Sequence, residues 1–251
     1  MVERNSQFDR VRGLIDVDLL HGCQVVLIGA GTLGYCIADE LCRHGVGRFF
    51  LVDGDHVERR NLIGTGYMHA DVGKPKVEAL ASHLRAIHPS VSVTYQAKYL
   101  TDEDVSRIVD MAGRSDLLIL AADAFGLMLD IADACHDRCP IVMGSFGERA
   151  DTGEVAFTLP GKTASLRMTF GKRKRKAISK PRALGTNTRF ITSFASDLCL
   201  RLLLGGARGS ELFACYANAP LYILGLRRTW IFQNQPADLV RSVVCVGNPA
   251  S

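Results

Sequence analysis

Short apolar runs alternate with amphipathic stretches through the first 150 residues of the chain. Runs with the length and composition of buried strands lie at residues 24–28, 49–52, 117–120 and 141–143. Stretches with apolar residues three and four apart, the spacing of a helix, lie at residues 35–44, 74–87, 102–112 and 126–138. Residues 91–95 alternate between apolar and polar, as a half-buried strand does. This alternation predicts an α/β fold with a mostly parallel sheet and helices on both faces.

The pattern changes after residue 150. Residues 154–159 predict another strand, and residues 190–204 predict an amphipathic helix that ends at a glycine pair. Between them, residues 162–189 are basic and lack a clear period, so we expect a mobile loop there. The tail, residues 220–246, carries two apolar strand-like pieces that we expect to complete the sheet.

Length and composition indicate one globular domain. The 251 residues allow one large domain or two small ones, and 47% hydrophobic with 22% charged residues excludes a chain disordered throughout. The last hundred residues resemble an appendage, so we interpret residues 1–251 as one domain, with a core at 1–150 and a C-terminal part at 190–251. No apolar run approaches the ~18 residues that a membrane helix needs, and the first residues lack the apolar core of a signal peptide. We therefore expect a cytoplasmic protein with no membrane partner.

The net charge and the cysteine content give little information about function. The net charge is +4, and the basic excess is concentrated in five consecutive residues at 172–176. A solvated loop is the simplest interpretation, and steering of an acidic partner is the alternative. We do not expect a nucleic-acid partner, because no aromatic residues interleave with the basic ones. The eight cysteines contain no C-x-x-C pair, so we interpret them as reduced thiols.

A glycine motif carries the first chemical signal. Gly29, Gly31 and Gly34 form G-x-G-x-x-G between the first predicted strand and helix. In such a motif the glycines turn the chain, let the backbone approach a phosphate and let the helix pack closely. Asp53 closes the next strand, where a carboxylate can accept hydrogen bonds from ribose hydroxyls. A Rossmann-like nucleotide site is expected, and NAD and ATP fit these residues equally well.

The segment after Asp53 separates the two nucleotides. It reads Asp53-Gly54-Asp55-His56-Val57-Glu58-Arg59-Arg60-Asn61-Leu62, followed by Asp71-Val72-Gly73-Lys74-Pro75-Lys76. Hydride transfer requires no second acid, asparagine and lysine at this place. The arrangement resembles the ThiF/MoeB/HesA family, the bacterial relatives of ubiquitin-activating enzymes. The resemblance covers roughly residues 8–160 and 190–204, and further segments that carry it are Phe8-Asp9-Arg10, Ala121-Ala122-Asp123-Ala124, Pro140 to Ser145 and Gly153-Glu154-Val155.

The resemblance implies an enzyme that uses ATP to adenylate the C-terminal carboxylate of a small ubiquitin-like or sulfur-carrier protein, with release of pyrophosphate. It implies ATP and Mg²⁺ as cofactors, a homodimer, and a crossover loop at residues 162–189. The implied nucleotide-binding residues are Gly29, Gly31, Gly34, Asp53 at the ribose, and Asp55, Asn61 and Lys76 at the phosphates. The implied catalytic residues are Lys76, which stabilises the transition state, Asp123, which would hold Mg²⁺, and Arg10, which reaches the triphosphate across the dimer interface.

The chain also departs from the family. Where the family continues Asn-Leu-x-Arg, this chain has Gly64, and Arg59 or Arg60 could substitute for the missing arginine. The paired C-x-x-C motifs that hold zinc in many relatives are absent, so we expect no zinc. Residues 162–189 contain no cysteine, so we expect an acyl-adenylate that passes to another acceptor rather than a thioester on this chain.

Alternatives remain at this point. Asp123 could be a helix cap, and Lys76 a solvated surface lysine. The chain could activate a tRNA base or a peptide carboxylate instead of a carrier protein. Gly64 and the missing loop cysteine leave room for a non-catalytic binding module. An NAD-dependent dehydrogenase is the alternative that the Asn61, Lys76 and Asp123 pattern opposes.

Overall fold

Five parallel strands form the first part of one continuous sheet. The computed structural model describes residues 7–146, 152–170, 185–208, 221–225, 229–232 and 243–246. The parallel strands are β1 (Gln24–Ile28), β2 (Arg48–Val52), β3 (Ser92–Gln96), β4 (Leu117–Leu120) and β5 (Ile141–Phe146). They lie in the order β3-β2-β1-β4-β5, so the direction of winding reverses between β1 and β4. Ligands of open α/β sheets bind beside such a reversal, outside the carboxyl ends of the strands.

The sheet then continues with antiparallel strands. These are β6 (Thr152–Thr158), β7 (Leu221–Gly225), β8 (Thr229–Phe232) and β9 (Val243–Val246), each paired with the one before it. The result is a nine-stranded sheet, and the predicted Rossmann-like fold with a C-terminal extension is confirmed. The tail supplies three strands where the apolar pattern predicts two.

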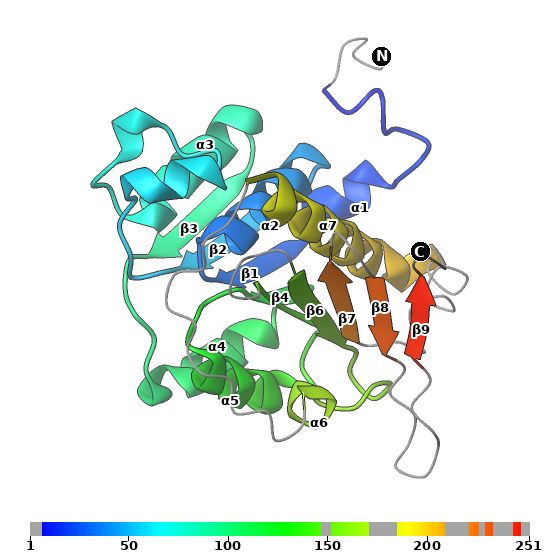
Figure 1. Ribbon diagram of the computed structural model, residues 1–251. Helices are drawn as coiled ribbons and strands as arrows, with labels where there is room; N and C mark the ends of the chain where they lie inside the picture. Colours follow the sequence, from blue (N-terminus) through cyan, green and yellow to red (C-terminus); the bar gives the residue numbers. More distant parts are fainter. Residues whose placement is uncertain are drawn as a thin grey trace, which may run out of the picture.

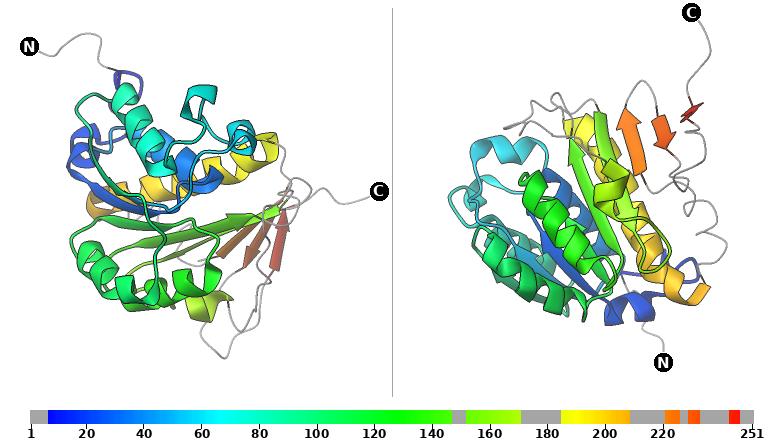
Figure 2. Two further views of the ribbon diagram at one scale, coloured as in Figure 1. Left: turned by 90° about the vertical axis from the view of Figure 1, so that its left-hand side faces the viewer. Right: turned by 90° about the horizontal axis from the view of Figure 1, so that it is seen from below.

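Helices cover both faces of the sheet (Figures 1 and 2). One face carries α1 (Val17–Gly22), α2 (Thr32–Arg43), α3 (Lys76–Ile87) and α7 (Gly185–Arg208). The other carries α4 (Val105–Ala112), α5 (Phe125–Cys135) and α6 (Leu166–Phe170). Three short 3₁₀ helices, η1 (Arg59–Ile63), η2 (His69–Asp71) and η3 (Asp102–Asp104), lie in the connections. None of the described helices is both long enough and apolar enough to cross a membrane.

Each face of the sheet packs its own core. Val25 and Leu27 of β1 belong to the cluster beneath α2, α3 and α7, whereas Val26 and Ile28 belong to the cluster beneath α4, α5 and α6. A strand whose two faces are both buried must be apolar at every position, which explains why these strands are visible in the sequence as short continuous apolar runs.

The basic segment after β6 differs from its prediction. Helix α6 lies inside the range 162–189 that we expect to be a loop, and α7 begins at Gly185 instead of residue 190. Helix α7 also ends later than predicted, at Arg208. Residues 171–184, which include the five consecutive basic residues, lie outside the described residues.

Candidate nucleotide-binding site

The glycine loop joins β1 to α2, and two of its glycines are required by close packing. Gly29 has a φ of +97°, and a Cβ there would lie 2.6 Å from the Ala121 carbonyl carbon. A Cβ on Gly34 would lie 1.9 Å from the Gly29 carbonyl oxygen. These contacts bring the first turn of α2 against the end of β1.

Gly31 differs, because a Cβ there would meet nothing within 4 Å. It is the N-cap of α2, and its φ of −71° suits any residue. The space in front of it adjoins the unpaired amides at the start of the helix. Such amides and the helix dipole form an anion-binding site.

Asp53 ties this loop to the end of β2. Its two carboxylate oxygens accept hydrogen bonds from the backbone amides of Ala30 at 2.6 Å and Asp55 at 2.7 Å. Burial raises the pKa of Asp53, although the Lys76 charge and the two amides act in the opposite direction. Each oxygen retains a second lone pair, so the group can also accept from ribose hydroxyls.

Lys76 and Asp55 form an ion pair beside the loop. Lys76 is the first residue of α3 and only 8% exposed, and its Nζ donates to Asp55 Oδ2 at 2.7 Å. Tyr99 Oη donates to the other carboxylate oxygen of Asp55 at 2.6 Å. Burial favours a higher pKa for Asp55, but hydrogen bonds from Lys76 and Tyr99, with the charges of Lys76 and Arg60, together lower it below its usual value. The alternative that Lys76 is a solvated surface lysine is therefore wrong.

Tyr67 fixes the relative position of the loop and the lysine. Its buried hydroxyl lies 2.8 Å from the Ala30 carbonyl oxygen and 3.1 Å from the Lys76 carbonyl oxygen. Sequence reasoning identified neither Tyr67 nor Tyr99. For Tyr99 the available signal is an aromatic residue just after β3, beside the strand that Asp53 closes.

Asn61 has a local structural role in addition to its predicted one. It lies in η1, and its side-chain oxygen accepts the backbone N–H of Glu58 at 2.8 Å. Its side-chain amide group still has donors for an anion. Contact with phosphate stays a prediction.

Asp123 lies at the same sheet edge as the glycine loop. Ala121 donates its backbone N–H to the Ile28 carbonyl at 2.8 Å, which aligns the chain after β4 with the chain after β1. Asp123 is exposed, and Ala124, not Asp123, is the N-cap of α5. Helix capping therefore does not explain Asp123.

A magnesium ion fits this carboxylate. Among the described residues no group of three or more His, Cys, Asp or Glu side chains could hold a metal by itself. Mg²⁺ characteristically takes one or two protein carboxylates and completes its coordination with waters and substrate phosphates. An exposed Asp123 at the same sheet edge as an open anion site meets that requirement.

The remaining predicted residue, Arg10, lies far from this edge in its own chain. The Phe8 ring packs against His88, which follows α3, with ring centroids 5.4 Å apart, and a Cβ on Gly45, just beyond α2, would lie 3.5 Å from the same ring. Both contacts are at the ends of helices that begin at the site. One chain therefore brings together the glycines, Asp53, Asp55, Lys76 and Asp123, but not Arg10.

The position where the family has an arginine, Gly64, has little space for a side chain. Gly64 is buried, and a Cβ there would lie 3.0 Å from both Thr32 Cγ2 and Thr32 Oγ1, at the start of α2. An arginine at this position would require Thr32 to move.

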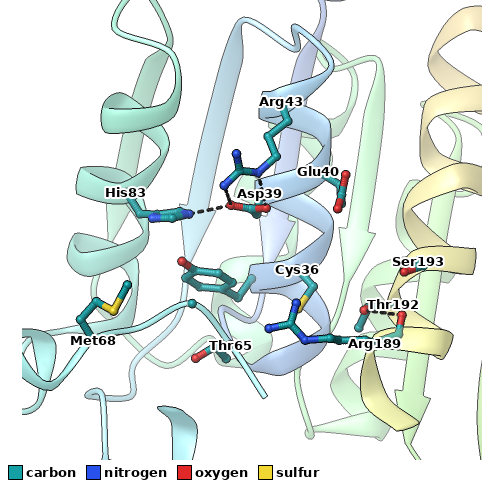
Figure 3. Close-up of a pocket in the computed structure, with 12 residues that line it drawn as sticks. Cys36, Asp39, Glu40, Arg43, Thr65, Met68, His83, Arg189, Thr192 and Ser193 are labelled. Atoms are coloured by element: carbon teal, nitrogen blue, oxygen red, sulfur yellow. Dashed lines mark hydrogen bonds and ion pairs between the residues drawn. The ribbon is translucent and has the colours of Figure 1, made fainter. Parts of the chain in front are cut away.

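A separate groove of about 330 Å³ follows the outer side of α2, between α3 and α7 (Figure 3). Asp39 lies at its centre, where it accepts hydrogen bonds from Arg43 Nε at 2.8 Å and pairs with His83 Nε2 at 2.6 Å. Arg189 of α7 lines the opposite side. The groove faces away from the sheet, so it is distinct from the nucleotide edge.

The chain matches a family model and several known proteins. The ThiF family model matches residues 2–221. The chain is 30% identical over 158 residues to ubiquitin-like modifier-activating enzyme 5 of Caenorhabditis briggsae, covering 59% of this chain and 37% of that protein. It is 36% identical over 126 residues to the SAMP-activating enzyme E1 of Haloferax volcanii, covering 49% of this chain and 45% of that protein. The chain thus spans less than half the length of these relatives.

Solved structures share the fold. The crystal structure of Escherichia coli MccB with ATP matches with a TM-score of 0.69 and 18% identity, covering 98% of this chain and 73% of that one. The crystal structure of PaaA matches with a TM-score of 0.60 and 23% identity, covering 93% of this chain and 67% of that one.

Proposed function

Since the chain belongs to the ThiF family, we propose that it adenylates the C-terminal carboxylate of a small ubiquitin-like or sulfur-carrier protein with ATP and releases pyrophosphate. The observation that carries this proposal is the arrangement at one sheet edge. An open helix N-terminus at Gly31, a carboxylate at Asp53 and the Lys76–Asp55 pair lie around the strand-order reversal. A dehydrogenase requires the first two but not a nearly buried lysine beside a second acid.

The chain's residues account for the transfer. The acceptor carboxylate oxygen attacks the α-phosphorus of ATP, a new P–O bond forms, and the bond to the leaving pyrophosphate breaks. Negative charge builds on the phosphate oxygens, and Lys76, held at the mouth of the loop by α3, stabilises that charge. Asp53 orients the nucleotide through the ribose, and the amides near Gly31 bind phosphate. Mg²⁺ held by Asp123 would neutralise phosphate charge.

The site is complete only in an assembly of two chains. We assign Arg10 to the site of a partner copy, because its own chain holds it at the opposite end of α2. This position supports a contribution to the triphosphate of the partner copy and not to its own. A homodimer is therefore part of the proposal.

The product is an acyl-adenylate that passes to another acceptor. Burial raises the pKa of the Cys36 thiol to about 11 and also raises the pKa of Cys199. Thiols in such surroundings are poor nucleophiles near neutral pH, which supports a reaction without a thioester on the described part of this chain. The reducing cytoplasm is the compartment we propose.

Pyrophosphate exchange tests the proposal. The full chain is incubated with ATP, Mg²⁺ and labelled pyrophosphate together with candidate carriers that end in Gly-Gly. Carrier-dependent incorporation of label into ATP is the expected result. AMP release with purified tRNA or with a short peptide, and none with any carrier, would replace the carrier protein by that acceptor. No nucleotide turnover with any of the three would favour a binding module.

A further inference from the structure

The proposed nucleotide edge holds more negative than positive charge before any nucleotide binds. Asp53 and Asp55 lie beside one cation, Lys76, whose ammonium group already bonds Asp55 at 2.7 Å. Asp123 adds a third carboxylate at the same edge. A triphosphate brings further negative charge, so a second cation from the chain would stabilise the complex.

Arg60 lies in the right place to supply that cation. It belongs to η1, between Asp55 and Asn61 in the sequence, and its side chain is 49% exposed. Its positive charge contributes to lowering the pKa of Asp55. Gly64, the C-cap of the same 3₁₀ helix, lies against Thr32 at the start of α2, so η1 is beside the open helix N-terminus. The guanidinium group is exposed enough to meet a ligand there.

The present partner of Arg60 is easily exchanged. The guanidinium group bonds the carboxylate of Glu58, which is itself 54% exposed. Ion pairs between exposed groups contribute little to stability. A guanidinium group binds a phosphate with the same two-pronged geometry that it uses for a carboxylate. The Arg60 guanidinium group can therefore exchange Glu58 for a phosphate with little loss of free energy.

Neighbouring positions do not offer an equivalent cation. Position 64 is glycine and carries no charge, and Thr32 lies close to where its Cβ would be. Arg59 is exposed and forms no ion pair within the described part of the chain. Arg59 therefore serves as a matched control with the same charge one residue away.

We propose that Arg60 leaves Glu58 and binds a phosphate group of the nucleotide beside Lys76. This inference rests on the proposed function, because it requires a nucleoside triphosphate at this edge. It makes Arg60 a specificity-determining residue for phosphorylated nucleotides, and it gives the chain a phosphate-binding arginine although position 64 is glycine.

Binding measurements on the full chain test the proposal. Dissociation constants for ATP with Mg²⁺ and for adenosine are measured for wild type, Arg60→Ala, Arg60→Lys and Arg59→Ala, with circular dichroism to verify folding. Arg60→Ala should weaken ATP binding at least tenfold and leave adenosine binding unchanged, because adenosine has no phosphate. Arg60→Lys should recover part of the loss, and Arg59→Ala should stay within twofold of wild type.

The possible failures can be told apart. If Arg60→Ala and Arg59→Ala weaken ATP binding equally, the effect is one of overall positive charge, and the assignment of Arg60 is overturned. An equal loss for adenosine and ATP would indicate damage to the fold of the site and would also overturn it. Absence of ATP binding by the wild type would refute the proposed function itself, before any variant is compared.

Discussion

At the scale of single residues, Asp55 accepts hydrogen bonds from two side chains at the proposed phosphate end of the site. Lys76 bonds one of its oxygens at 2.7 Å and Tyr99 bonds the other at 2.6 Å. Lys76 is almost buried, and the Asp55 carboxylate is the counter-charge of its ammonium group. Tyr99 in turn keeps Asp55 ionised and oriented toward the lysine.

This arrangement predicts a pH effect of Tyr99→Phe. Loss of the hydroxyl should raise the pKa of Asp55 toward its ordinary value of 3.8. A carboxylate with a lowered pKa in the folded state stabilises the protein above its unfolded pKa, and this contribution disappears as the pH falls through the folded value. The stability difference between wild type and Tyr99→Phe should therefore be largest above about pH 4 and shrink in more acidic solution.

Unfolding by urea at several pH values measures this difference. Tyr95→Phe, which removes a hydroxyl from β3, is the control. A difference between wild type and Tyr99→Phe that does not change with pH would contradict the role given to the Tyr99 hydroxyl.

At the scale of elements, the glycine loop assigns close packing and the proposed phosphate binding to different glycines. Gly34 lets α2 approach the end of β1, whereas Gly31 leaves space at the helix N-terminus. Tyr67 then attaches the loop to the first residue of α3. The geometry of the site thus depends on how α2 and α3 pack on the sheet.

A pair of alanine variants separates the two tasks. Gly34→Ala should lower the free energy of unfolding by at least about 2 kcal/mol, because its Cβ would overlap the Gly29 carbonyl oxygen. Gly31→Ala should leave stability nearly unchanged and weaken ATP binding about tenfold, or ~1.4 kcal/mol, by filling the space for phosphate. Chemical denaturation and calorimetric titration provide the two readouts. Equal destabilisation by both variants, or unimpaired ATP binding by Gly31→Ala, would be inconsistent with this division.

At the scale of the whole molecule, the proposal places Arg10 of one copy at the sheet edge of another copy. Under this account, Arg10→Ala and Lys76→Ala should each remove pyrophosphate exchange when tested alone. Mixed in equal amounts under conditions that allow subunit exchange, they should recover about a quarter of the wild-type activity, since half of the dimers then hold one intact site. Arg12→Ala, tested alone, should keep its activity and controls for the loss of a charge in the same segment. Recovery absent from the Arg10 mixture would exclude sharing of the site between copies.

Much of this organisation could be predicted from the chain itself. Strands buried on both faces are continuous apolar runs, so the sequence predicts β1 and β4 with the bounds that the structure has. The glycines, Asp53 and Lys76 follow a fixed spacing along one strand–helix–strand unit, and the fold brings them to one edge. The contacts of Tyr67 and Tyr99 could not be predicted, because they depend on the conformation of the connections in which these residues lie and on how those connections pack.

Two other features of the structure could not be predicted from the sequence pattern either. The local role of Asn61 in η1 depends on a short 3₁₀ helix, which has no apolar period to mark it. The early start of α7 lies in a basic stretch, where composition favours a loop although packing against α2 and β6 can stabilise a helix.

The most direct test of the central claim is nucleotide binding by the full chain, measured by calorimetry with ATP and Mg²⁺, with NAD, and with the Asp123→Ala variant. ATP should bind in a magnesium-dependent manner, NAD should not compete, and Asp123→Ala should lose the magnesium dependence. Binding of NAD in preference to ATP would contradict the proposed adenylation and would favour the dehydrogenase alternative.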